Sequence, residues 1–303
     1  MAWARPQAAP STRAFSSPGS YTLNGTLGVA GVSLSLSGST ASLDLGGFNA
    51  TVSGDFQTTG GALLIMQNSA DALIIAGNAI FDGGDETGLL TAGNLRVRGD
   101  FTQQATVSAT SYAASGTHTT TFNQNGSSVS FANFASHFQD LELLGAITTS
   151  LGSDIGVAGK FTASQTATNL KGNGFKVVVT AVAVQALTVD NATIVVDENG
   201  TGQAQQFDNV TFQNFPTTGV SMLQFIGPGG AAAPRNLTFN NVSFQSLPVG
   251  AGNLYVTLIS SNGFGLNLTM QGSNQGRQGG GNGLNLSNPP NETTVGGATI
   301  FWP

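Results

Sequence analysis

The sequence predicts an all-β chain wound as an elongated parallel β-solenoid, or β-helix. Three observations lead to this class. Short apolar runs of Val, Ile, Leu and Phe are separated by Gly, Asn, Ser and Thr, charged residues are scarce, and related segments recur roughly every 22 residues over part of the chain. A pair of antiparallel β-sandwiches would show a similar spacing of strands and is the alternative.

The scarcity of charged residues limits the kinds of partner that the chain can bind. Charged residues make up 8% of the 303 residues, against roughly 25% in an ordinary globular domain, while 40% are hydrophobic. Such a composition indicates a folded chain rather than a disordered one. With a net charge of -6 and only three lysines, no basic stripe exists to neutralise phosphates. We therefore expect neither nucleic acid nor an anionic membrane surface as a partner.

No targeting, membrane or disulfide signal stands out. The chain has no cysteine, so no disulfide framework is present and redox chemistry gives no compartment. The most apolar stretch, residues 177–189, is interrupted by Thr180 and Gln185 and is too short for a transmembrane helix, so we expect a strand there. The first 21 residues lack a continuous apolar core of a secretory signal.

One repeat places a glycine two residues after an apolar residue and directly before a polar one. It recurs at Gly54, Gly77, Gly99 and Gly159, with separations of 23, 22 and 60 residues, and the last gap has room for almost three units. A unit of this size, built from short strands, cannot bury its own apolar face. It needs a copy of itself above and below, which is the logic of a solenoid.

A second repeat is centred on asparagine, in VDNATIVV, FDNVTFQNF and FNNVSFQSL. Its central residues are Asn191, Asn209 and Asn241, with separations of 18 and 32. Asparagine tolerates the left-handed backbone of a tight bend and can stack on an asparagine of the next turn. We expect these three residues to form corners. Nineteen phenylalanines against three tyrosines and two tryptophans suit an interior that offers few polar partners.

The expected organisation has four parts. Residues 1–20 form an extended N-terminal tail that serves assembly, and residues 21–271 form the solenoid. Residues 272–297, rich in Gly and Asn, form a loop, and residues 298–303 form a short aromatic strand.

The segment GTHTTTFNQNGSSVSFANFASHFQDLELLG (residues 116–145), together with the Val-x-Gly-Asp-Phe units, resembles the repeats of secreted bacterial surface proteins of the adhesin and autotransporter-passenger kind. The similarity runs from about residue 45 to the end of the chain, on loose motifs. It implies a β-solenoid displayed or assembled outside the cell. It transfers no catalytic residue.

Candidate metal sites are weak in this sequence. Asp82, Asp85 and Glu86 form the densest carboxylate group and are the best calcium candidates, but they lack EF-hand spacing, and a solvated turn is the expected structure. His118 and His137 lie 19 residues apart, so one solenoid turn would stack them, yet no Cys or spaced carboxylate completes a site. We expect no metal and no cofactor.

A carbohydrate-active enzyme is the rival class, since polysaccharide lyases and glycosidases also use β-helices. Glycoside hydrolysis needs two carboxylates across a cleft, and a lyase would need clustered carboxylates near a basic residue. Arg96 and Arg98 flank no acidic pair beyond Asp100, and no nucleophile-elbow motif occurs. We therefore expect no catalytic residues, although distant turns could still assemble a site.

Asparagine followed two residues later by Ser or Thr is unusually frequent. It occurs at 11 of 25 asparagines, although Ser and Thr make up only 62 of the 303 residues. Two interpretations remain: an architectural pair on one strand face, or acceptors for N-linked glycans. The candidate glycosylation sites are Asn24, Asn49, Asn125, Asn191, Asn199, Asn209, Asn236, Asn241, Asn267, Asn285 and Asn291.

The leading functional hypothesis is a non-enzymatic, extracellular or cell-surface structural protein whose subunits associate end to end into a filament or surface layer. A solenoid leaves unpaired strand edges at both ends, and such edges either are capped or recruit another chain. The expected partner is another copy of the chain. An adhesin that binds glycans or other surface proteins along its flank is the alternative. The candidate assembly residues are Trp3, Phe15, Tyr21, Ile300, Phe301 and Trp302.

Overall fold

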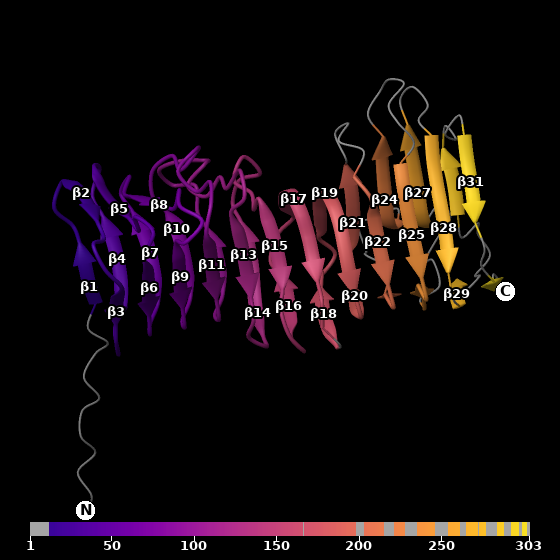
Figure 1. The fold of residues 1–303 in the computed structure, drawn as a ribbon, viewed down its shortest axis with the longest axis horizontal. Helices are drawn as coiled ribbons and strands as arrows, with labels where there is room; N and C mark the ends of the chain where they lie inside the picture. Colours follow the sequence, from indigo (N-terminus) through magenta and orange to yellow (C-terminus); the bar gives the residue numbers. More distant parts are fainter. Residues whose placement is uncertain are drawn as a thin grey trace, which may run out of the picture.

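The computed structural model of the chain is a rod of stacked β-strands (Figure 1). It describes residues 12–165, 167–197, 203–214, 221–227, 235–245, 254–260, 265–271, 273–276, 284–287, 292–296 and 299–301. These residues form strands and turns without a helix, so none of them provides a long apolar helix that could cross a membrane.

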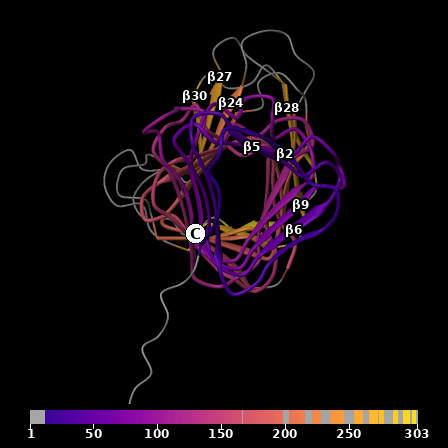
Figure 2. The same cartoon turned by 90° about the vertical axis from the view of Figure 1, so that its left-hand side faces the viewer.

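The turns of the rod lay their strands on three faces, which surround a common core when the rod is viewed along its length (Figure 2). Face A is a sheet of 13 strands in the described residues. Its strands are β1 (Thr12–Phe15), β4 (Ser33–Ser37), β7 (Phe56–Thr59), β10 (Ala79–Asp82), β12 (Phe101–Gln103), β14 (Ser127–Phe131), β16 (Thr148–Leu151), β18 (Thr168–Lys171), β20 (Leu187–Asp190), β23 (Thr211–Gln213), β26 (Ser243–Phe244), β29 (Ser273–Gly276) and β32 (Thr299–Phe301).

Face C follows the same axial order. It consists of β3 (Leu27–Val29), β6 (Asn49–Val52), β9 (Ala72–Ile75), β11 (Asn94–Val97), β13 (Thr119–Phe122), β15 (Asp140–Leu143), the second parts of β17 (Ile155–Ala163) and β19 (Lys176–Gln185), and then β22 (Gln205–Asp208), β25 (Arg235–Asn240), β28 (Gly265–Gln271) and β31 (Glu292–Gly296).

Face B is regular at both ends and irregular in the middle. It begins with β2 (Gly19–Thr22), β5 (Ala41–Asp44) and β8 (Leu63–Ile65), and it ends with the first parts of β17 and β19 followed by β21 (Thr193–Asp197), β24 (Ser221–Gly227), β27 (Leu254–Ser260) and β30 (Leu284–Ser287). Between β8 and β17 only isolated bridges occupy this face, such as Met66 with Leu90 and Ala113 with His137. The rod is therefore three-sided, with one interrupted side.

The strand pairing confirms the predicted parallel solenoid and rules out the antiparallel sandwiches for the described residues. Every pair between named strands is parallel, and the register on face A runs from Phe56 to Ala79 to Phe101, steps of 23 and 22 residues. Alternation follows this register, since inward residues are buried and outward residues are partly exposed along β7, β10 and β12. The repeat seen in the sequence is thus one turn of the rod.

The interior is a column of aromatic and aliphatic side chains. Phe81 and Phe101 stack with ring centroids 5.4 Å apart, and Tyr112 packs edge-on against both rings. All three side chains are fully buried. Burying one such side chain contributes about 1.5–3 kcal/mol, so each turn is stabilised chiefly by the turns on either side of it.

Three of the four glycines of the predicted repeat stack on one another in successive turns of the rod. The amide of Gly77 donates to the carbonyl of Gly54 (3.0 Å), and that of Gly99 donates to Gly77 (2.9 Å), so these three stack at the corner between faces C and A. Gly159 does not belong to this column. It lies inside β17, where the chain passes from face B to face C, and donates to the carbonyl of Gln139 (2.7 Å).

The asparagine repeat also divides between two corners. Asn191, Asn209 and Asn241 all have left-handed backbone, with φ of 53°, 51° and 54°. Asn209 and Asn241 stack where face C meets face A. Asn191 instead lies between β20 and β21, where face A meets face B, and its amide donates to the carbonyl of Gln213 (3.0 Å). The expectation of corners holds, and the three residues occupy two different corners.

The expected part boundaries differ from the strands. The region expected to be a tail, residues 1–20, contains β1 and the first residues of β2. The region expected to be a loop, residues 272–297, contains β29, β30 and β31. Residues 177–189 form most of β19 and most of β20, divided by a left-handed corner at Ala186. Pairing with the backbone of the preceding turn makes a strand even from Gly- and Asn-rich sequence, which hydrophobic patterning does not reveal.

Candidate functional site

The N-terminal end of the rod presents three strand edges side by side. Within the described residues β1 pairs only with β4, β2 only with β5, and β3 only with β6. Their other edges carry backbone groups that face along the rod axis. An unpaired edge of this kind is a template for another strand.

The core is open at the same end. Phe15 is in register with Leu36, Tyr21 with Leu43, and Leu27 with Ala50. The second residue of each pair is fully buried, whereas the first is only half-buried, because no described turn covers it. The rings of Phe15 and Tyr21 pack together with centroids 4.8 Å apart. A partly exposed apolar patch, here called the end patch (Phe15, Tyr21 and Leu27), therefore lies at this end of the rod.

Arg13 lies beside the end patch. It is in register with the buried Leu34, yet its side chain is exposed. Charged side chains on edge strands limit indiscriminate pairing. This arginine therefore narrows the range of strands that can join the end.

The opposite end of the rod has the same three-edged layout. In the described residues β30 pairs only with β27, β31 only with β28, and β32 only with β29. Ile300 and Phe301, two of the residues predicted to serve assembly, lie in β32. Phe15 and Tyr21 lie in the end patch, and Trp3 and Trp302 fall outside the described residues. Leu27 was missed, although its alternation with Val29 gave a signal.

The acidic cluster does not converge on one point. Asp82 accepts hydrogen bonds from the amide (3.0 Å) and hydroxyl of Thr106, and Asp85 from the amide of Thr87 (2.9 Å) and the hydroxyl of Thr110 (2.7 Å). The hydrogen bonds that Asp85 accepts, above all those from Thr87, lower the pKa of this carboxyl. Glu86 turns inward. No group of three potential metal ligands occurs among the described residues, so the calcium candidates are not brought together.

Glu86 belongs instead to a buried polar cluster where face B is interrupted. Its Oε1 accepts a hydrogen bond from the amide of Leu64 (3.0 Å), and Oε2 has no partner among the described residues. Burial raises the pKa of this carboxyl well above its usual value. Nearby, the Tyr112 hydroxyl lies 2.6 Å from Thr120 Oγ1 and 3.2 Å from His118 Nε2. Burial also raises the pKa of Tyr112.

The two histidines are not a stacked pair. His118 is fully buried, its Nδ1 donates to the carbonyl of Ala92 (2.8 Å), and burial lowers its pKa. His137 lies at the surface of face B, in register with Ala113. The 19-residue spacing is shorter than the local turn, so the two rings fall on different faces.

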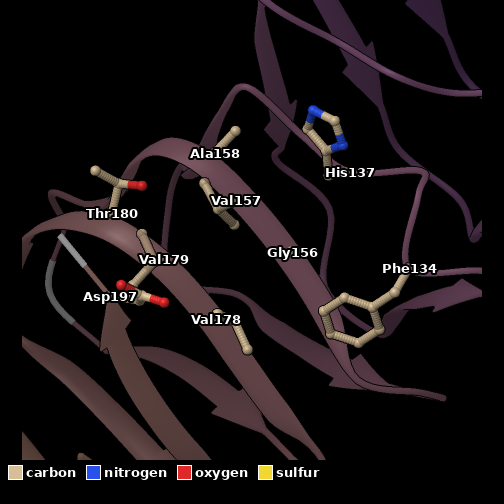
Figure 3. Close-up of a pocket in the computed structure, with 9 residues that line it drawn as sticks. All are labelled: Phe134, His137, Gly156, Val157, Ala158, Val178, Val179, Thr180 and Asp197. Carbon is tan, nitrogen blue, oxygen red and sulfur yellow. The ribbon is translucent and has the colours of Figure 1, made fainter. Parts of the chain in front are cut away.

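A shallow groove of about 240 Å³ lies on face B, with Phe134 and His137 along one side and Thr180 and Asp197 along the other (Figure 3). Its floor consists of outward positions of β17 and β19, including Gly156 and Val178. Phe134 is 54% exposed, which is unusual for a phenylalanine. Asp197 is the carboxylate among the described lining residues, one fewer than glycoside hydrolysis needs. The sequence gave no sign of this groove, since stacking alone joins its residues.

The candidate glycosylation sites differ in access. Asn24, Asn49, Asn125, Asn209, Asn236 and Asn241 are exposed. Asn191 is half-buried. Asn267 and Asn285 lie in β28 and β30, and Asn199 and Asn291 fall outside the described residues. Exposure alone does not separate the architectural interpretation from the glycan one.

Comparison of the chain with protein-family models, with curated proteins and with solved structures finds no match.

Proposed function

We propose that this protein is an extracellular structural protein whose subunits associate end to end into a filament or surface layer. The observation that carries the proposal is the N-terminal end of the rod, where three strand edges surround the half-buried end patch. A further turn stacked there would pair the edges and bury Phe15, Tyr21 and Leu27, as the internal turns do for one another.

The composition supports an extracellular setting. Only 8% of the residues are charged, and the outward strand positions carry mostly hydroxyl and amide side chains. The resemblance to secreted surface proteins points the same way. The partner in this proposal is another copy of the chain.

Sedimentation velocity over a range of protein concentrations tests the proposal. Wild-type protein is expected to form larger species as concentration rises, whereas the Phe15→Asp variant is expected to stay monomeric, because a carboxylate in the end patch opposes its burial. Phe48→Asp is the matched control, since Phe48 is 37% exposed in a turn between β5 and β6 on the flank. Its assembly should equal that of wild type. A wild-type chain that stays monomeric at all concentrations contradicts the proposal.

A second function, glycan binding along the flank, is supported by the groove on face B. An exposed aromatic ring beside a hydroxyl, an imidazole and a carboxylate offers both an apolar surface and hydrogen-bonding groups. Binding of soluble polysaccharides to immobilised protein tests it. Loss of binding in Phe134→Ala, with binding retained in Phe48→Ala, supports the function, and equal binding by both variants contradicts it.

A further inference from the structure

Six asparagines of the chain are followed directly by a glycine. Such an asparagine can react with its own backbone, because glycine has no Cβ to obstruct the neighbouring amide nitrogen. The structure describes three of the six pairs: Asn24–Gly25, Asn125–Gly126 and Asn173–Gly174. The three described pairs differ in how firmly a neighbouring turn holds them.

The Asn24–Gly25 pair lies in the turn between β2 and β3. Asn24 is exposed, and neither its side chain nor the amide of Gly25 makes a hydrogen bond within the described residues. A Cβ on Gly25 would meet nothing within 4 Å, and the φ of Gly25 lies outside the left-handed region. A Cβ on Gly46 of the next turn would meet Thr22 and Leu23, so that turn packs on the residues before the pair. The amide nitrogen of Gly25 is therefore free to approach the side chain of Asn24.

The Asn125–Gly126 pair is held by the following turn. Asn125 is exposed, as Asn24 is, but its Oδ1 accepts a hydrogen bond from the amide of Thr148 (2.9 Å). The amide of Gly126 donates to the carbonyl of Thr148 (2.9 Å). Both the side chain and the attacking nitrogen are thus fixed, although the pair faces solvent.

The Asn173–Gly174 pair is held from both sides. Nδ2 of Asn173 donates to the carbonyl of Leu151 in the preceding turn (2.9 Å). The amide of Gly174 donates to the carbonyl of Asn191 in the following turn (2.7 Å). Two hydrogen bonds must therefore open before this pair can react.

From this contrast we propose that Asn24 is a site of spontaneous deamidation. The amide nitrogen of Gly25 loses its proton to solvent and forms a bond to Cγ of Asn24, and Nδ2 leaves as ammonia. Water then opens the resulting five-membered succinimide at either carbonyl, which gives aspartate or isoaspartate. The reaction needs water alone as a co-reactant, and its rate rises with pH because the attacking nitrogen must lose its proton.

The products change the surroundings of the end patch. Either product adds a carboxylate, and isoaspartate also lengthens the backbone between β2 and β3 by one atom. Leu23 and Leu27, on either side of the pair, pack against the core. A charge beside an apolar contact opposes its burial, so modified protein should assemble end to end less readily. This last consequence rests on the proposed function, whereas the modification does not.

Peptide mapping by mass spectrometry tests the modification. The folded wild-type chain is incubated in mildly alkaline buffer, and timed samples are digested at acidic pH, where further deamidation is slow. A host that attaches no N-linked glycans supplies the protein, because a glycan would occupy the same nitrogen of Asn24. Asn24 should convert at least about tenfold faster than Asn125 and Asn173, since two hydrogen bonds must open at each of those sites.

Two controls separate the sequence from the structure. In denaturant the three sites should react at similar rates. Gly25→Ala adds a methyl group where the turn has room for it, and its Cβ obstructs the attack, so the folded variant should lose the fast conversion at Asn24. Equal rates at the three sites of the folded wild-type chain, or an unreactive Asn24 in a chain that reacts when denatured, would overturn the proposal.

Sedimentation of aged wild type beside aged Gly25→Ala tests the consequence for assembly. Less assembly in aged wild type is the expected result. Equal assembly by the two aged proteins would overturn that consequence and leave the modification standing. Failure of fresh wild-type protein to assemble would instead contradict the proposed function.

Discussion

Asn241 donates a hydrogen bond from Nδ2 to Oδ1 of Asn209 over 3.0 Å, although 32 residues separate them in the sequence. Both lie in left-handed backbone at the corner between faces C and A, and the amide of Asn209 also donates to the carbonyl of Asn240 (2.7 Å). The side chains therefore stack as the backbones do. Architecture explains this asparagine pair whether or not sugars are attached.

Replacement of Asn209 by alanine should destabilise the protein by about 1–2 kcal/mol, because alanine is disfavoured at positive φ and loses the hydrogen bond to Asn241. Asn209→Gly keeps the backbone freedom and should cost less. Chemical denaturation of both variants checks the order. Equal stability of the alanine variant and wild type would show that the corner is not strained.

The same corner offers a stabilising change. Ala186 occupies the preceding turn, with φ of 54°, and its amide donates to the carbonyl of Asp208 (2.8 Å). Ala186→Asn suits the left-handed backbone and extends the asparagine stack, so we expect a gain of about 1 kcal/mol. Thermal unfolding measures the gain, and a lower melting temperature would contradict it.

The stacked glycines should tolerate no side chain. A Cβ on Gly77 would lie 2.4 Å from Asp55 Oδ1 and 2.7 Å from the backbone of Gly54, whereas a Cβ on Gly28 would meet nothing within 4 Å. Gly77→Ala is expected to cost about 3 kcal/mol through overpacking, and Gly28→Ala less than about 1 kcal/mol. Chemical denaturation of the Gly77→Ala and Gly28→Ala variants measures the two losses of stability. Similar losses would show that the stacked glycines can shift to accommodate a side chain.

Buried Glu86 should make stability depend on pH. Its folded pKa is raised above the ordinary 4.5, so above pH 4.5 the unfolded chain releases a proton that the folded chain retains. Stability is then highest below pH 4.5 and is lost as pH rises toward the raised value, by at most about 1.4 kcal/mol per pH unit.

The lowered pKa of His118 acts in the opposite sense, removing stability as pH falls below 6.5. The comparison is therefore made between wild type and Glu86→Gln, because both proteins contain His118 and its contribution cancels in the difference. The difference in unfolding free energy should shift in favour of the variant as pH rises above 4.5. A difference that does not change with pH would place the Glu86 proton elsewhere.

Glycan attachment should follow access to both parts of the acceptor pattern. Asn24 with Thr26 and Asn49 with Thr51 are exposed, whereas Asn191 is half-buried and its partner Thr193 is 2% exposed, with the hydroxyl donating to Ser221. In a host that attaches N-linked glycans, peptide mass mapping should find them at Asn24 and Asn49 rather than at Asn191. The reverse occupancy would mean that attachment precedes folding.

The solenoid could be predicted from the sequence because the period of the repeat equals one turn of the rod. Gly54, Gly77 and Gly99 recur with that period at one corner. It did not reveal which corner a turn residue occupies. A three-sided rod has three equivalent places for a tight bend, so Gly159 and Asn191 satisfy the same motif at other corners.

The candidate site divides in the same way. Phe15 and Tyr21 followed from the logic of an open solenoid end, whereas the groove around Phe134 joins residues up to 63 positions apart, from Phe134 to Asp197. Only the register of stacked turns brings them together. Local motifs cannot report such a site.

Electron microscopy of the full chain beside the Phe15→Asp, Tyr21→Asp double variant tests end-to-end assembly most directly. Wild-type protein should form rods one solenoid wide and many times the length of a single chain, and the double variant should form single short rods. Single short rods in both samples, or broad sheets in which rods lie only side by side, would contradict the account.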